Sequence, residues 1–242
     1  MRICLAQSEA IKGDIRANIQ NHLGLIKRAA ERRANVVVFP ELSITGYEPT
    51  LANALATYPE DPILRPFQAI SDQHQITIGA GMPTKADTGL HISMLIFQPH
   101  QAKPLVYTKR LLHADERPYF KSGNNQPSLV IGSCTIAFGI CYESLQPAHF
   151  VQAKKKGADL FLASVAKSVS GTDRAYAYFP SLAQEYETPI LMVNAVGHCD
   201  DFLSNGLSVV WDASGQRMGQ LNSQQQGLIL YDTEQRTTEI EQ

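Results

Sequence analysis

Cys141 is the residue with the strongest claim to reactive chemistry. It ends the apolar stretch AFGIC at 137–141, follows Gly139 by two positions and precedes a helical pattern that begins at Gln146. A thiol near the start of a helix has its thiolate stabilised by free backbone N–H groups and by the helix dipole, which is how nucleophilic cysteines are made. The alternative is a core cysteine that behaves as a small hydrophobic residue. We interpret the other three cysteines in that way: Cys4, Cys134 and Cys199.

Two other strand ends carry an ionisable residue. Glu41 directly follows the apolar run VVVFP at 36–40. A carboxylate half-shielded by apolar walls has a raised pKa and can act as a general base or acid near neutral pH. Lys109 follows the short apolar segment LVYT at 105–108, and Glu116, seven residues later, can pair with its ammonium group. Each of these residues taken alone is more often an ordinary solvated charge, but ligands bind at the carboxyl ends of strands in α/β sheets, so together they outline a candidate site.

Other familiar kinds of site lack their signature. No two cysteines have the separation of two to four residues that is typical of structural zinc sites, and no paired-histidine helix motif occurs. The sequence has no Gly-x-Ser-x-Gly elbow, no Gly-x-Gly-x-x-Gly loop and no Walker-type lysine loop. We therefore expect no metal and no cofactor, and the arrangement of Glu, Lys and Cys remains.

Composition excludes several classes of protein. Of the 242 residues, 44% are hydrophobic and 18% are charged, which is typical of a globular chain and not of a disordered or fibrous one. The net charge is −2, and the only dense basic cluster is 154–156, so we expect no nucleic-acid partner. No apolar stretch approaches the ~18 residues of a membrane span, and the apolar run at the N-terminus is too short for a secretory signal. We expect a cytoplasmic protein with reduced thiols and no membrane partner.

The elements that must position these residues alternate between strands and helices, which predicts an α/β fold. Asp14 can cap a helix whose apolar residues recur near a period of 3.6, and further helices are predicted at 63–74, 146–156 and 173–187. The number of predicted strands favours two sheets over one. We expect a single domain over 1–242 with a loose polar tail at about 233–242. The predicted strands are 3–7, 36–39, 76–80, 92–97, 105–108, 129–131, 135–140, 160–163, 190–196, 207–211 and 228–231.

Read together, the three segments resemble the motifs of the nitrilase superfamily of carbon–nitrogen hydrolases. FPELSITGY at 39–47 is similar to the glutamate motif, YTKRLL at 107–112 to the lysine motif, and GICYE at 139–143 to the cysteine motif. The spacings of 68 residues from Glu41 to Lys109 and 32 residues from Lys109 to Cys141 are of the kind that the family has. Glu116 matches the family's second glutamate.

The resemblance implies a four-layer α-β-β-α sandwich that is usually doubled by dimerisation, so we expect a homodimer. It also implies a mechanism in which Cys141 attacks the carbonyl carbon of a small amide while Glu41 takes the thiol proton. Lys109 and the backbone N–H of Tyr142 would stabilise the oxyanion, and Glu116 would orient Lys109 or the amide. A thioester on Cys141 would then be hydrolysed, without any cofactor. Three residues are expected to contact the substrate: Tyr47 and Tyr142, which lie within the motifs, and Ala166, which lies outside them.

Some positions depart from the common pattern of the family. The pair Tyr142 and Glu143 favours amide over nitrile hydrolysis, although Glu143 is equally well a support for the site through backbone hydrogen bonds or a structural cap. The segment ASVAKS at 163–168 lacks the tryptophan that often lines the substrate pocket, which leaves the substrate open. Two alternatives also stay open: nitrile hydrolysis, and a nitrilase-like binding or scaffold protein without turnover. Candidates for contact with a polar substrate tail are Arg174, Tyr176 and Tyr178.

Overall fold

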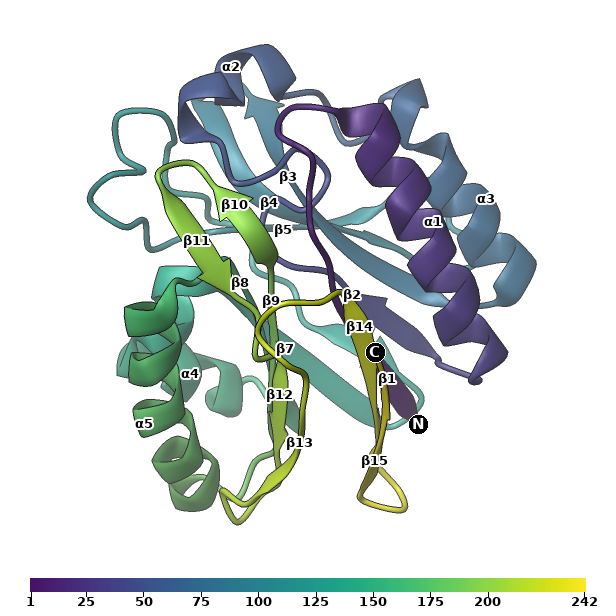
Figure 1. The fold of residues 1–242 in the computed structure, drawn as a ribbon, viewed down its shortest axis with the longest axis vertical. Coiled ribbons are helices and arrows are strands. Elements are labelled where there is room, and N and C mark those ends of the chain that lie inside the picture. Colours follow the sequence, from purple (N-terminus) through teal and green to yellow (C-terminus); the bar gives the residue numbers. More distant parts are fainter.

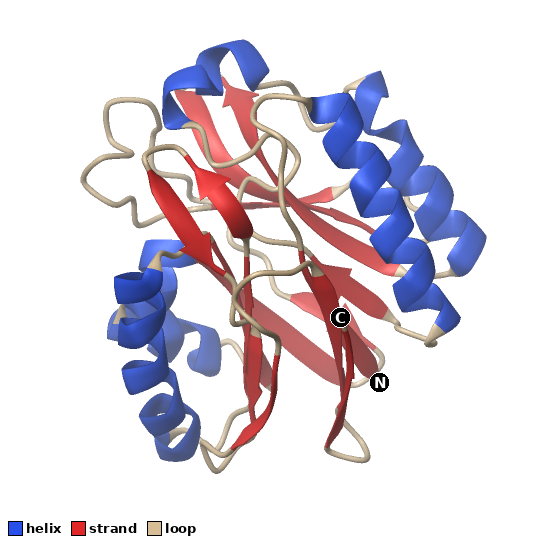
Figure 2. Ribbon diagram, in the orientation of Figure 1, coloured by secondary structure: helices blue, strands red, loops and turns tan.

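Two β-sheets packed face to face form the centre of the molecule, and helices cover their outer faces (Figure 1). The computed structural model describes all residues from 1 to 242. The layers follow the order α-β-β-α, with helices on the outer side of each sheet (Figure 2). The predicted α/β class with four layers is confirmed.

The first sheet has a parallel centre with antiparallel strands added on both sides. β1, β2 and β3 pair in parallel, and the hairpin strands β4 and β5 extend the sheet at one edge. Helices α1 (Ile15–Glu31) and α3 (Arg65–His74) cover its outer face, and the Asp14 side chain caps α1 as predicted. In sheet order the strands are β15 (Thr237–Glu241), β14 (Gly227–Asp232), β1 (Arg2–Gln7), β2 (Val36–Val38), β3 (Thr77–Ala86), β4 (Gly89–Phe97) and β5 (Leu105–Thr108).

The second sheet is built on the same plan. β7, β8 and β9 pair in parallel, and helices α4 (Pro147–Lys155) and α5 (Val169–Glu185) cover its outer face. In sheet order the strands are β13 (Arg217–Gln220), β12 (Val209–Trp211), β9 (Ile190–Asn194), β8 (Leu160–Val165), β7 (Cys134–Ile140) and β6 (Leu129–Ile131). The shorter elements are η1 (Pro49–Leu51), α2 (Ala52–Leu55), η2 (Pro62–Leu64), η3 (Cys141–Leu145), β10 (Val196–Cys199) and β11 (Phe202–Asn205).

The main core lies between the sheets, where 28 buried hydrophobic residues pack together. Side chains along a strand alternate between the two faces, so Ile3 and Leu5 of β1 enter this core while Cys4 packs beneath the helices of the first sheet. On β7, Ile140 likewise points between the sheets. The two faces of each sheet thus pack into different parts of the core.

The prediction of a loose tail at 233–242 is wrong. Residues Thr237–Glu241 form β15, which pairs antiparallel with β14. The polar composition of this segment suits an edge strand, because its outward carboxylates meet basic side chains: Glu239 bonds to Arg2, and Glu241 bonds to Arg28. None of the helices has the length and apolar content that a membrane crossing would need.

Candidate active site

Three of the predicted site residues lie one to three residues beyond the ends of strands, on the same side of the two sheets. Glu41 lies beyond β2 and Lys109 beyond β5, both in the first sheet, whereas Cys141 follows β7 of the second sheet and begins η3. Cys141 has a φ of +47°, a strained backbone conformation for a residue with a side chain. Gly139 permits this tight turn, since a Cβ atom there would lie 2.7 Å from the ring of Phe161 and 2.9 Å from Cβ of Ser144.

Lys109 is the centre of a buried group of charges, which we call the ion cluster and which consists of Glu41, Lys109 and Glu116. The Lys109 ammonium donates to Glu41 Oε1 at 2.7 Å and to Glu116 Oε1 at 2.5 Å, and all three side chains are almost completely buried. Burial alone lowers the pKa of Lys109, but the two carboxylates outweigh it and leave that pKa above its ordinary value. The ammonium is therefore permanently charged and fixed in place.

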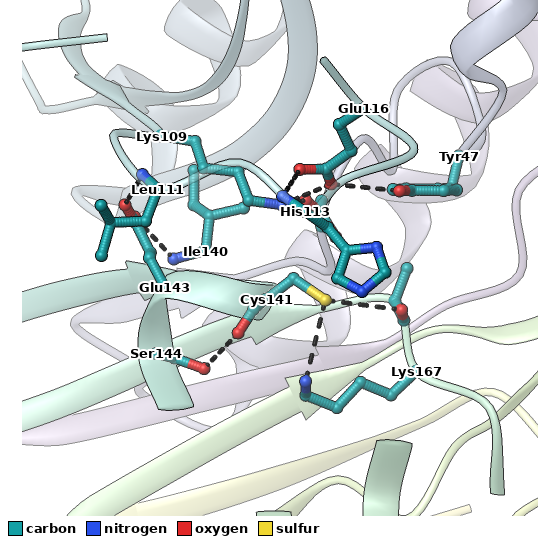
Figure 3. A network of polar contacts seen from close by, with 12 residues as sticks. Tyr47, Lys109, Leu111, His113, Glu116, Ile140, Cys141, Glu143, Ser144 and Lys167 are labelled. Atoms are coloured by element: carbon teal, nitrogen blue, oxygen red, sulfur yellow. Dashed lines mark hydrogen bonds and ion pairs between the residues drawn. The ribbon is translucent and has the colours of Figure 1, made fainter. Parts of the chain in front are cut away.

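Glu116 is held on every side. Its Oε1 also accepts a hydrogen bond from the Tyr47 hydroxyl at 3.0 Å, and its Oε2 accepts one from the backbone N–H of His113 at 2.8 Å (Figure 3). The carboxylate is therefore an anchor for the Lys109 ammonium and has no free oxygen for a reacting group.

Glu41 is held less completely. Lys109 bonds to its Oε1, while its Oε2 is buried and has no protein donor at hydrogen-bond distance. Burial is the main reason why the pKa of Glu41 is raised to about 7; Lys109 lowers it and Glu116 raises it further, and the thiol of Cys141 contributes a smaller lowering. Glu41 can thus take up and return a proton near neutral pH.

The Cys141 thiol does not match the expectation of a stabilised thiolate. Burial, followed by the charge of Glu41, raises the pKa of Cys141 to about 11, although Lys167 and Lys109 lower it. η3 is a 3₁₀ helix of only five residues, so it offers little of the dipole on which the prediction rested. The resting group is a thiol that donates to the backbone carbonyl of Ala166 at 3.6 Å, and it needs a base to become a nucleophile.

A cavity of about 150 Å³ opens onto the sulfur. The three residues predicted to contact substrate all line it: Tyr47, Tyr142 and Ala166. A larger hollow of about 630 Å³ around Cys134 and Asp212 contains none of the predicted site residues, so chemistry and not size identifies the site. No group of three or more His, Cys, Asp or Glu side chains is arranged to hold a metal ion.

Glu143 is a buried brace behind the site. Its carboxylate accepts hydrogen bonds from the backbone N–H of Ile140 at 3.0 Å, from that of Arg110 at 2.8 Å and from that of Leu111 at 3.2 Å. It also accepts from the Tyr107 hydroxyl at 2.7 Å. The structure shows both roles left open by the sequence: the bond from the Ile140 N–H caps the start of η3, and the bonds from Arg110 and Leu111 support the segment that follows Lys109.

Lys167 is a site residue that the sequence analysis did not single out. It lies just beyond β8, its side chain is 6% exposed, and its Nζ lies 3.8 Å from Sγ of Cys141 (Figure 3). The sequence does carry a signal for Lys167, because this lysine follows an apolar strand just as Glu41 and Lys109 do. Among the residues proposed for a substrate tail, Arg174 lines the cavity, whereas Tyr176 and Tyr178 do not.

Comparison with known sequences agrees with the motifs. A family model described as carbon-nitrogen hydrolase matches residues 2–242. A glutamine-dependent NAD(+) synthetase of Thermotoga maritima is 26% identical over 230 residues, which are 89% of this chain and 39% of that relative. The chain thus spans about two fifths of the synthetase's length. A probable nitrilase of Schizosaccharomyces pombe is 23% identical, and the match covers 90% of this chain and 83% of that one.

Comparison with solved structures agrees with the fold. An amidase from Nesterenkonia sp. superimposes with a TM-score of 0.86 at 26% identity, covering 95% of this chain and 89% of that one. A mutant amidase from Nesterenkonia sp. AN1, which carries the product of Michael addition of acrylamide on its active-site cysteine, gives a TM-score of 0.88 at 24% identity and covers 96% of this chain and 92% of that one. The predicted nitrilase-type sandwich is confirmed. Because the family model matches almost the whole chain and the fold agrees, this protein belongs to the carbon–nitrogen hydrolase family of enzymes.

Proposed function

We propose that the protein is an amidase, which hydrolyses the C–N bond of a small amide through a thioester on Cys141. The observation that carries the proposal is the ion cluster beside a thiol that opens into a small cavity. The cluster supplies a base that titrates near neutral pH and a permanent positive charge, which are the two groups that acyl transfer to a thiol requires.

The first half of the reaction forms the thioester. Glu41 takes the thiol proton as Cys141 attacks the amide carbon, and a C–S bond forms. Because the pKa of the thiol, about 11, lies above that of Glu41, about 7, proton transfer is unfavourable before attack, and we expect the two events to be coupled. The charge that develops on the carbonyl oxygen is stabilised by Lys109 and by the backbone N–H of Tyr142. Glu41 then protonates the leaving nitrogen as the C–N bond breaks.

The second half returns the enzyme to its starting state. Ammonia or an amine has left, and Glu41, again unprotonated, takes a proton from a water molecule that attacks the thioester carbon. The C–S bond breaks, a carboxylic acid is released, and the proton held by Glu41 returns to the Cys141 sulfur. Glu116 keeps Lys109 in place throughout.

Ammonia release from a panel of amides, carbamoyl amines and nitriles tests the proposal. We expect release from at least one small amide, and a mass increase on Cys141 that corresponds to the acyl group when the reaction is quenched. Release from nitriles but not from amides would favour nitrile hydrolysis. No release from any compound, with alkylation of Cys141 no faster than that of Cys134, would favour a binding or scaffold protein without turnover.

A second candidate substrate is the side-chain amide of glutamine. Several relatives are named glutamine-dependent NAD(+) synthetases, although this chain matches only about two fifths of their length. Glutamine therefore belongs in the panel. As part of the same proposal, the protein is a homodimer in the cytoplasm, and a solution mass equal to that of a single chain would contradict the dimer.

A further inference from the structure

Lys167 is a buried ammonium group with no carboxylate partner. Its side chain is 6% exposed, no acidic side chain lies within 4.0 Å of its nitrogen, and its only polar contact is the Cys141 sulfur at 3.8 Å. An unpaired charge that is withdrawn from water is costly, and buried cations are therefore normally paired. The missing partner is thus expected to be something that enters the cavity.

Hydrogen bonds of its backbone and the packing of its side chain fix the position of Lys167. Its backbone N–H donates to Asn194 Oδ1 at 2.8 Å, and its carbonyl accepts from the backbone N–H of Asn205 at 2.8 Å and from Ser204 Oγ at 3.2 Å. On α5, a Cβ atom at Gly171 would lie 3.1 Å from Cβ of Lys167. The glycine leaves room for the lysine stem, which therefore holds the ammonium beside the sulfur.

Stabilising a resting thiolate does not explain this arrangement. Even with both lysines nearby, the pKa of Cys141 is raised to about 11, so the sulfur keeps its proton and Glu41 is still required. The charge of Lys109 is already shared between two carboxylates. Lys167 therefore adds a positive charge that the general base and the oxyanion do not need.

The charges that line the cavity leave an excess of positive charge on the side of the second sheet. Glu116 is engaged by Lys109, and the exposed Asp115 pairs with His113. Arg174 donates only to the backbone carbonyl of Ser170, at 3.3 Å, and has no acidic partner. The cavity thus presents one buried ammonium beside the sulfur and one exposed guanidinium farther out.

We propose that Lys167 is a specificity-determining residue that binds a carboxylate of the substrate, so that the preferred substrates are the monoamides of short dicarboxylic acids. This inference rests on the proposed amidase function. The chain between the two carbonyl groups must be short, because the ammonium lies 3.8 Å from the sulfur to which the acyl group becomes attached. The cavity of about 150 Å³ is also smaller than the ~300–1,000 Å³ of ordinary ligand pockets. One water molecule is consumed, the C–N bond breaks, and the products are the dicarboxylate and an ammonium ion.

The diamide of each acid is a neutral control of nearly the same shape. We therefore compare kcat/KM for malonamate with malonamide, succinamate with succinamide, and glutaramate with glutaramide. For at least one pair, the monoamide is expected to be favoured by about 10- to 100-fold, the range for a hydrogen bond between charged groups. L-Glutamine, which adds an ammonium group to glutaramate, is expected to be a poorer substrate than glutaramate. Diamides that are hydrolysed as well as the monoamides, or a preference for glutamine, would overturn the inference while leaving the amidase function intact.

Lys167→Met keeps the length of the stem and removes the charge. It is expected to abolish the preference by lowering kcat/KM for the monoamide more than that for the diamide, whose smaller loss reflects the effect of the Lys167 charge on the Cys141 thiol. The matched control is Lys27→Met, at an exposed position on α1, which should alter neither value. An equal loss for both substrates would mean that Lys167 assists the thiol and does not select the substrate. If no amide is hydrolysed at all, the proposed function fails and the inference fails with it.

A second measurement needs neither a variant nor turnover. Iodoacetate and iodoacetamide both form a C–S bond with the thiol and release iodide, but only iodoacetate carries a carboxylate next to the reacting carbon. The ratio of the two alkylation rates is measured by peptide mass analysis at Cys141 and at the partly exposed Cys134. We expect the ratio to favour iodoacetate at Cys141 by at least several-fold relative to Cys134. Equal ratios at the two cysteines would contradict carboxylate binding by Lys167.

Discussion

In the first sheet Lys109 is bonded to two buried carboxylates, whereas in the second sheet Lys167 is buried to a similar degree and has none. The charges of both lysines act on the same sulfur, one from each sheet. The paired lysine belongs to a cluster whose charges are largely compensated within the protein, so it can be preorganised for a transition state at little cost. The unpaired lysine is left for a charge that arrives from outside. We infer that satisfied charges here serve catalysis and unsatisfied ones serve recognition.

The largest effect is expected from removing the sulfur. Cys141→Ala should abolish turnover of every amide, because no thioester can form. Cys134 lies outside the cavity that opens onto Cys141, so Cys134→Ser should leave activity nearly unchanged. The measurement is steady-state ammonia release with both variants at matched concentration. Equal activity in the two variants would show that Cys141 is not the nucleophile, and the roles assigned to Lys109 and Lys167 beside it would both fail.

Removing the paired lysine comes next. Lys109→Met should lower kcat by about 100- to 1,000-fold, the range for loss of one oxyanion donor, and it should do so equally for monoamides and diamides. Because the Lys109 charge lowers the pKa of Glu41, the pH at which activity is half-maximal should also rise in this variant. A raised KM with kcat unchanged would instead make Lys109 a substrate anchor, and the contrast with Lys167 would fail.

The pH dependence of the native enzyme is the third test. Glu41 must be unprotonated to act as the base, and its pKa is raised to about 7, so kcat/KM should fall as the pH is lowered through 7. Well below that pKa the loss is about tenfold per pH unit. No matching fall is expected between pH 7 and 9, because the pKa of the thiol is about 11 and Lys109 stays charged. A fall of kcat/KM centred near pH 4.5 would show that burial does not raise the pKa of Glu41.

How far the sequence predicts this site depends on whether a residue acts locally or through distant partners. Glu41, Lys109 and Cys141 were found because each follows an apolar strand, a pattern that is visible along the chain. The pairing of Lys109 with both carboxylates was only partly predicted, since the contact with Glu41 joins residues 68 positions apart. The raised pKa of Cys141 was missed because desolvation depends on what packs around the sulfur. The edge strand β15 was missed for the same reason, since its arginine partners lie in β1 and α1.

Lys167 shows a different limit. It follows an apolar strand as Lys109 does, yet a lysine near a strand end is usually solvated, and only the structure reveals that this one is buried without a partner. The resemblance gave no help either, because the segment at 163–168 departs from the family's common pattern. At positions that depart from the family pattern, a sequence motif gives the least information about the substrate.

Glu143 joins the two sheets behind the sulfur, and it gives the smallest effect that we expect. It accepts from Arg110 and Leu111 on the side of Lys109 and from Ile140 on the side of Cys141. Glu143→Gln replaces one oxygen by an NH₂ group that faces N–H donors, so buried donors lose their acceptor at a cost of about 1–3 kcal/mol in the free energy of unfolding. Because the brace positions both sheets, kcat should fall by a similar factor for monoamides and diamides while KM changes less. Glu185→Gln, at an exposed position on α5, is the control for thermal unfolding and kinetics, and a Glu143→Gln variant that loses only monoamide activity would mean that Glu143 acts through Lys167 alone.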